Sequence, residues 1–140
     1  MNQCPDPIVN AIFDFNEQVV KIPDVPLNTL TEQQFEWTIK FCQEELAEFT
    51  EAYHEQDAIK MVDGILDLIY GAMGTLKKMG LTRDQVFRSM MAIHAANMTK
   101  KRGATSRGGE EDAVKPIDFV PPEQAIGQIL LEGIREGDVA

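Results

Sequence analysis

Two groups of carboxylates in this sequence have types and spacings that could hold a cation. The first is the motif Glu44-Glu45-x-x-Glu48, and the second is Asp63 and Asp67, four residues apart in an otherwise apolar run. Residues four apart lie on one face of a helix. Because burying carboxylates without partners is very costly, we expect something cationic between the two groups. Oxygen ligands of this kind suit a hard divalent cation.

Each carboxylate group also has an ordinary structural interpretation. The glutamates could form a solvated acidic helix face, although no lysine or arginine occurs between Phe41 and Ile59 to pair with them. Gly64, Gly71 and Gly74 accompany the aspartates, and each costs a helix about 1 kcal/mol relative to alanine. They indicate that the backbone closely approaches another element or a ligand. A tight helix crossing with the aspartates at its wet edge would explain them without a metal.

A cluster of basic residues follows the last predicted long helix. Asn97 and Lys100 are one helical turn apart, and Lys101 and Arg102 come next. Cations at a helix end often only complement the macrodipole. Beside a metal site, however, such a cluster would bind phosphate oxygens.

The elements that must position these residues are helices. Capping boxes at Thr31-x-x-Gln34 and Thr82-x-x-Gln85 open two of them. The predicted helices begin at 7, 31, 57 and 82. The first reaches 20, the second has an apolar stripe through Tyr53, the third ends at Gly80 and the fourth at about 102, followed by a mobile loop at about 103–115 and a strap with a short helix at 116–135. The third helix is apolar nearly all round, so we expect it to be buried. No segment alternates like a strand, so we predict a single all-α domain, 1–140, built as a four- to five-helix bundle.

Composition limits the classes of partner and compartment. The 140-residue chain carries a formal net charge of -10, which argues against non-specific binding to nucleic acid or anionic membranes. Two cysteines are too few for a disulfide scaffold. There is neither an N-terminal leader pattern nor an apolar run of 18 residues. We therefore expect a cytoplasmic protein, with no nucleic-acid or membrane partner.

The motifs, taken in order, match a known family. Glu-Glu-x-x-Glu, then Asp-x-x-x-Asp-Leu-Ile-Tyr-Gly, then Asn-x-x-Lys resembles the all-α nucleoside triphosphate pyrophosphohydrolases. These are the MazG-type enzymes and the phosphoribosyl-ATP pyrophosphohydrolase-like proteins of phages and bacteria. The resemblance runs from about Ile8 to Leu130 and includes Phe119-Val120-Pro121-Pro122 near its end. If the chain is phage-encoded, the compartment would be the host cytoplasm.

The resemblance implies a reaction, a cofactor and an assembly. The reaction is the Mg2+-dependent attack of water on the α-phosphorus of a (deoxy)nucleoside triphosphate, with Mn2+ able to substitute. The implied assembly is a homodimer or a dimer of dimers. Glu44 would orient or deprotonate the water, and Glu45, Glu48 and Asp67 would bind metal. The sequence departs from the family pattern at Gly64, where a glutamate is usual, so Asp63 would take that ligand's place.

Substrate contacts follow from the same resemblance. Asn97 and Lys100, with Lys101 beside them, would bind the triphosphate, and Asn16 would contact the base or ribose. Two alternatives stay open at this point. One is phosphoribosyl-ATP pyrophosphohydrolase itself, and the other is a helical binding or assembly protein without catalysis.

Overall fold

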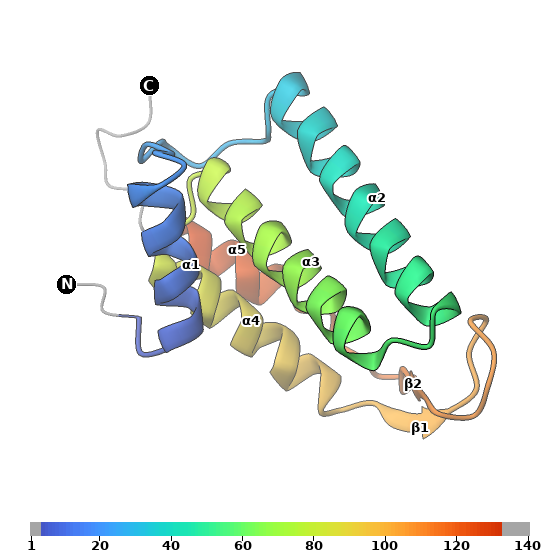
Figure 1. Cartoon of the computed structure of the whole chain (residues 1–140). Helices are drawn as coiled ribbons and strands as arrows, with labels where there is room; N and C mark the ends of the chain where they lie inside the picture. The colour runs from blue at the N-terminus through green and yellow to red at the C-terminus, as the bar shows by residue number, and fades with distance from the viewer. Residues whose placement is uncertain (1–3, 133–140) are drawn as a thin grey trace. The chain divides into compact units, whose positions relative to one another are not determined.

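The protein is described from a computed structural model, which covers residues 4–132. Figure 1 shows its helices and two short strands. The elements are α1 (Pro7–Gln18), α2 (Glu32–His54), α3 (Ala58–Lys78), α4 (Arg83–Asn97), β1 (Lys101–Gly103), β2 (Asp112–Val114) and α5 (Glu123–Leu131). The predicted all-α class is confirmed. Chain contacts define two compact units, Met1–Arg83 and Asp84–Ala140, and each is described by itself. The single domain stays a prediction.

The first unit is organised around the antiparallel pair α2 and α3, which lie side by side (Figure 1). The Gln34 backbone N–H donates to Thr31 Oγ1 at 3.2 Å, and the Thr31 backbone N–H donates to Gln34 Oε1 at 3.0 Å. The predicted capping box is confirmed. The Asp57 side chain caps α3 by accepting from the Lys60 amide at 3.0 Å. Between the helices, Gln56 takes a positive φ of 57°. This short turn reverses the chain and sets the two helices against each other.

Helix α1 packs on α3 through one face. Asp6 caps it by accepting from two backbone amides, and Pro7 follows at the first helical position, where its missing N–H costs nothing. Val9, Ile12 and Phe13 are its buried apolar residues. These three, together with buried Asn16, attach α1 to the rest of the unit.

The end of α3 is fixed by Gly80, the predicted C′ residue. Gly80 has a φ of +94°, a conformation that side chains with a Cβ rarely adopt. A Cβ there would lie 2.6 Å from the backbone oxygens of both Val25 and Pro26. The Asn28 amide also donates to the Met79 carbonyl at 3.0 Å. The segment between α1 and α2 is therefore held directly against the end of α3.

The second unit differs from the prediction at its centre. Helix α4 ends at Asn97, about five residues before the predicted end, and residues 101–114 contain a hairpin instead of a structureless loop. Lys101 pairs with Val114 and Gly103 with Asp112. The prediction missed it because each strand has only three residues, too few for an alternating pattern to show. The strap leads into α5 as predicted, although residues 133–135 of that segment lie outside the described residues.

Burial contradicts one sequence prediction. Helix α3 is not buried in the single chain, because large apolar side chains along it are widely exposed, among them Ile59 (82%), Val62 (60%) and Leu66 (58%). On α2, Leu46 and Tyr53 are also half exposed. The helix packs on α2 and α1 with only part of its circumference. Within residues 4–132, no helix has the length and apolar character needed to cross a membrane.

We predict that Gly80→Ala lowers the free energy of unfolding by at least about 1–3 kcal/mol, the cost of the φ that alanine disfavours, because its Cβ would also meet the Val25 and Pro26 carbonyl oxygens. The matched control is Gly127→Ala in α5, where a Cβ meets nothing within 4 Å. That change should stabilise the protein by about 0.4–1 kcal/mol. Urea denaturation of both variants measures the difference, and an unchanged midpoint for Gly80→Ala would contradict the role given to Gly80.

Candidate functional site

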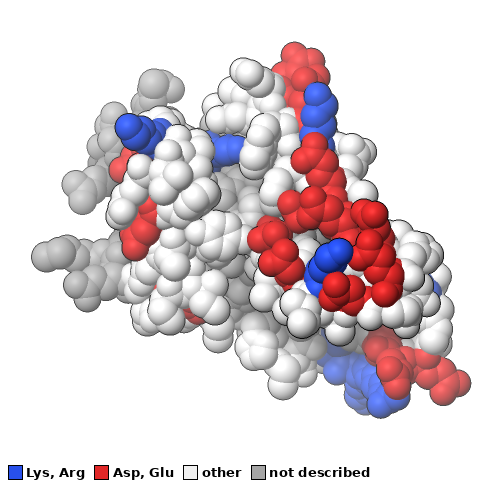
Figure 2. Space-filling model, viewed as in Figure 1, with Lys and Arg blue, Asp and Glu red and all other residues white. Residues whose placement is uncertain are grey.

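The antiparallel packing of α2 on α3 brings the two predicted carboxylate groups together. Glu45 and Asp67 line one cavity of about 590 Å³, and Glu48 and Asp63 line another of about 370 Å³. Figure 2 shows acidic side chains gathered where α2 ends and α3 begins. Each cavity thus joins one predicted carboxylate of α2 with one of α3, and their role as a metal site stays a prediction.

Glu45 is the electrostatic centre of this cluster. Burial raises its pKa, and the negative charges of Glu48, Asp67, Asp63 and Glu44 raise the pKa further, in that order. Its Oε2 atom is buried without a hydrogen-bond partner. Among the described residues, none of these five carboxylates forms an ion pair with lysine or arginine. Glu45 therefore carries an unpaired buried oxygen in a negative field.

The structure corrects the reason for expecting a cation at this site, which was the burial of the two aspartates. Asp63 and Asp67 are exposed in the single chain, not buried, so their burial does not demand a partner. The demand comes from Glu45 instead, since an unpaired buried polar atom is costly. An oxygen-only donor set suits Mg2+ chemically. As the side chains stand in residues 4–132, no three His, Cys, Asp or Glu residues are grouped closely enough to hold one ion.

Beside Glu45, the larger cavity has aromatic walls. Phe15, Trp37, Phe41 and Tyr70 line it. The rings of Trp37 and Phe41 are stacked, with centroids 5.4 Å apart and an angle of 8° between their planes. Phe15 and Tyr70 meet edge to face at 5.5 Å. A flat apolar ring of a ligand fits walls of this kind.

Two of the α3 glycines make room for these groups. A Cβ on Gly71 would lie 2.1 Å from the Phe41 ring, and one on Gly74 would lie 2.8 Å from the Asn16 amide nitrogen. The predicted close approach of the α3 backbone to another element is confirmed at these positions. It also places Asn16 in the same cavity as Glu45 and Asp67, as the sequence prediction requires. Asn16 is 7% exposed, and its amide nitrogen donates to the Ile12 carbonyl at 2.8 Å.

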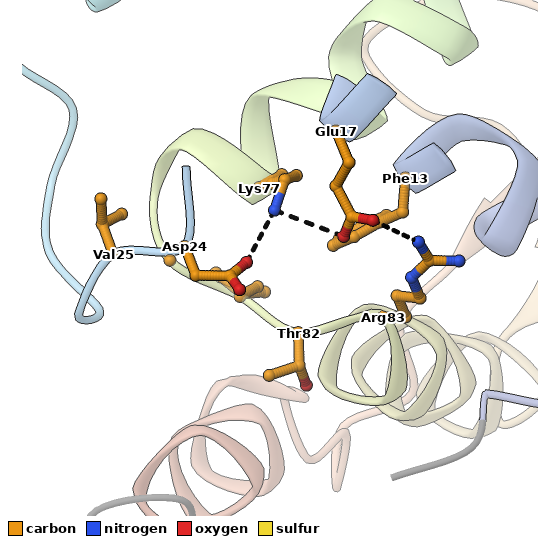
Figure 3. Close-up of a pocket in the computed structure, with 9 residues that line it drawn as sticks. Phe13, Glu17, Asp24, Val25, Lys77, Thr82 and Arg83 are labelled. Carbon is orange, nitrogen blue, oxygen red and sulfur yellow. Dashed lines mark hydrogen bonds and ion pairs between the residues drawn. The ribbon is translucent and has the colours of Figure 1, made fainter. Parts of the chain in front are cut away.

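A smaller cavity of about 410 Å³ lies on the other side of the α3 end. Figure 3 shows its ion pairs: Lys77 Nζ lies 2.9 Å from Asp24 and 3.5 Å from Glu17, and Arg83 lies 2.8 Å from Glu17. Lys77 is only 3% exposed, and its hydrogen bond and charge lower the pKa of Asp24. Both cations form ion pairs with carboxylates of the protein. Lys77 thereby fixes the 19–30 segment, and neither cation is free to bind a charged ligand.

Sequence reasoning missed Lys77, and it also missed its neighbour Lys78, which lines the aromatic cavity. Two adjacent lysines near a helix end look like a response to the macrodipole. Only the packing of the 19–30 segment shows that their side chains serve different cavities. No local signal in the sequence distinguishes them.

The predicted phosphate-binding residues lie in the second unit. Asn97 is the last residue of α4, Lys101 begins β1, and the Lys100 amide donates to the Asn97 carbonyl at 3.0 Å. Lys100 Nζ is 5.5 Å from the centroid of the Phe119 ring. The expectation that Lys100 and Lys101 continue the helix is wrong, because the chain turns after Asn97. Their contact with a triphosphate stays a prediction.

The comparison with protein families identifies the class of protein. The sequence model of the family "Phosphoribosyl-ATP pyrophosphohydrolase" matches residues 14–94, more than half of the chain. The chain therefore belongs to this family of all-α pyrophosphohydrolases. The matched range contains Asn16 and all five carboxylates of the cluster, and it ends before Asn97. No curated protein matches the sequence.

Family membership establishes the type of chemistry at a coarse level. It indicates a hydrolase that cleaves a phosphoric anhydride of a nucleotide. Of the five carboxylates between α2 and α3, Glu45 and Asp67 line the aromatic cavity.

Proposed function

We propose that this protein hydrolyses a (deoxy)nucleoside triphosphate to the monophosphate and pyrophosphate. One observation carries the proposal: Glu45 and Asp67 line the same cavity as Asn16 and four aromatic side chains. Metal-bound phosphates would lie at the carboxylates, and the nucleoside would extend along the aromatic walls. Turnover of the nucleotide separates this proposal from a binding or assembly protein without catalysis.

Phosphoribosyl-ATP is the second candidate substrate. The family match favours it as strongly as a simple triphosphate, because the matched family takes its name from that reaction. Both substrates present a nucleoside triphosphate to the same carboxylates. The two candidates differ at the base, which carries a further phosphoribosyl group in only one of them.

The carboxylates of the cluster would have separate roles in hydrolysis. We assign metal binding to Glu45, Glu48 and Asp67, with Asp63 replacing the usual glutamate of the family. Mg2+, or Mn2+ in its place, would neutralise phosphate charge and lower the pKa of a bound water. Glu44 would accept the proton as water attacks the α-phosphorus and the bond to the bridging oxygen breaks. Asn97, Lys100 and Lys101 would bind the oxygens of the triphosphate that become pyrophosphate, which would leave as the product.

We also propose that the protein functions as a homo-oligomer, a dimer or tetramer. Monomeric soluble proteins rarely expose large contiguous apolar patches. Helix α3 exposes Val62, Leu66 and Ile69, and α2 exposes Leu46 beside its glutamates. A second copy placed on this face would bury apolar side chains that neither helix covers, and it would place the cluster near an interface.

We predict that Glu48→Gln lowers kcat by more than tenfold, about 1.4 kcal/mol of barrier, while circular dichroism stays native. The amide keeps the volume and removes a charge that a metal ligand needs. Pyrophosphate release from each deoxynucleoside triphosphate and from phosphoribosyl-ATP, with Mg2+, measures it and identifies the substrate. Glu36→Gln, an exposed change on the same helix, is the control and should be silent. A fully active Glu48→Gln enzyme would exclude Glu48 as a ligand.

We predict opposite effects of Glu45→Gln with and without metal. Without metal, the change removes a charge that its neighbours repel and should raise the free energy of unfolding by about 0.5–2 kcal/mol, the usual range of a stabilising single substitution. With Mg2+ at a hundredfold excess over its Kd, the wild type should gain about 2.7 kcal/mol by mass action, and Glu45→Gln should gain much less. Thermal unfolding measures both. Equal gains from Mg2+ in the two proteins would refute a metal site at Glu45.

We predict that Leu66→Glu shifts the protein to monomers, because it places a charge in the middle of the exposed apolar face of α3. Sedimentation velocity or light scattering after size exclusion measures the mass. Ile117→Glu replaces an equally apolar residue that is fully exposed in the second unit, and it should leave the mass unchanged. A wild-type protein that sediments as a monomer at micromolar concentration would disprove the assembly.

A further inference from the structure

The aromatic cavity has chemically different ends. Glu45 and Asp67 mark one end, and Trp37 and Lys78 mark the other. Trp37 precedes Glu45 by eight residues on α2, and Lys78 follows Asp67 by eleven on α3. At 1.5 Å per residue these separations are about 12 Å and about 16 Å along antiparallel helices. A nucleotide whose phosphates lie at the carboxylates would extend its base toward Trp37 and Lys78.

Lys78 has an unusual environment for a lysine. Its Nζ lies 3.5 Å from the centroid of the Trp37 ring, whose plane stacks on Phe41. Among the described residues it has no carboxylate partner, in contrast with its neighbour Lys77, which pairs with Asp24 and Glu17. Burial lowers the pKa of Lys78. It is a partly desolvated cation that faces the cavity without a counter-charge.

The two residues that mark this end of the cavity carry hydrogen-bond donors only, and Asn16, which packs against Gly74 one turn before Lys78, adds an acceptor oxygen further along the wall. A lysine ammonium and an indole N–H can donate but cannot accept. The carboxylate acceptors of the cavity lie at the opposite end. An exocyclic amino group that faces Lys78, as in cytosine or adenine, would therefore meet a charged donor and find no acceptor on that residue, which is costly in a desolvated site. A carbonyl oxygen at the same position would accept from Lys78.

We infer that Lys78 determines base specificity by selecting nucleotides whose base carries a carbonyl oxygen in place of the exocyclic amino group. This inference rests on the proposed function, which sets the direction of the nucleotide in the cavity. It favours uracil over cytosine and guanine over adenine. A phosphate, such as that of a phosphoribosyl group, suits this end less well, because one ammonium among aromatic rings offers a dianion too few charged donors.

Binding of monophosphates tests the inference without any turnover. Trp37 is the single tryptophan of the chain, so its fluorescence reports occupancy of this cavity. We expect the full-length wild type, with Mg2+, to bind dUMP about 10- to 100-fold more tightly than dCMP, the range for one hydrogen bond to a charged group. The pair dGMP and dAMP should show the same order.

Variants at position 78 connect the preference to the ammonium group. Lys78→Met keeps most of the apolar stem and should weaken dUMP binding about 10- to 100-fold while changing dCMP binding less than threefold. Lys78→Arg keeps a donor and should recover part of the preference. Lys40→Met, an exposed change on α2, is the matched control and should leave both affinities unchanged. Thermal unfolding confirms that each variant is folded.

Several results would overturn the inference. They are equal binding of dUMP and dCMP by the wild type, absence of any fluorescence change with nucleotide, or an equal loss of both affinities in Lys78→Met. A Lys78→Met variant that loses affinity for phosphoribosyl-ATP alone would assign the lysine to a phosphate and would also overturn it. Failure of the proposed function is a separate result. In that case the wild type releases no pyrophosphate, while the monophosphate preference and its loss in Lys78→Met can still be measured.

Discussion

The close packing of α2 on α3 is the constraint on which the rest of the first unit depends. Carboxylates that repel one another are held together there, and burial adds to the cost at Glu45. Apolar contact and caps at both helix starts must outweigh that repulsion. Gly71 and Gly74 permit the close approach by leaving space for Phe41 and Asn16. The same bare backbone that weakens α3 as a helix thus shapes the cavity beside the carboxylates.

The site combines a charged surface and an apolar surface, which favour different parts of a ligand. The carboxylate cluster needs cations and water, whereas the aromatic walls need a ligand that excludes water. Glu45 belongs to both, because it lines the aromatic cavity and lies within the negative field of the cluster. A nucleotide is a ligand with the same division, with a charged phosphate chain at one end and a flat ring at the other. On the proposed function, one cavity would therefore take the whole molecule.

Local features of this protein could be predicted from sequence, and features that depend on distant partners could not. The capping box at Thr31 and the caps at Asp57 and Gly80 follow from a few adjacent residues, and all three are confirmed. Helical spacing also predicts that the glutamates of α2 and the aspartates of α3 share one face each, and the structure places Glu45 with Asp67 and Glu48 with Asp63 in shared cavities. Their role as metal ligands stays a prediction. The burial of α3 was predicted wrongly, since apolar content indicates what a helix would bury but not whether the single chain supplies the cover. The hairpin at 101–114 and the roles of Lys77 and Lys78 depend on contacts with no local pattern.

The two adjacent lysines at the end of α3 also set the rotation of that helix about its own axis. The buried Lys77 pairs with Glu17 and with the exposed Asp24, so the helix cannot turn about its axis without breaking these ion pairs. Successive residues of a helix are about 100° apart. Inserting or deleting a single residue between Asp67 and Lys77 would therefore turn the aspartates away from α2 while the lysine stayed in place. The nine residues between them set a fixed angle between the two side chains, and their number matters to the site as much as their identity.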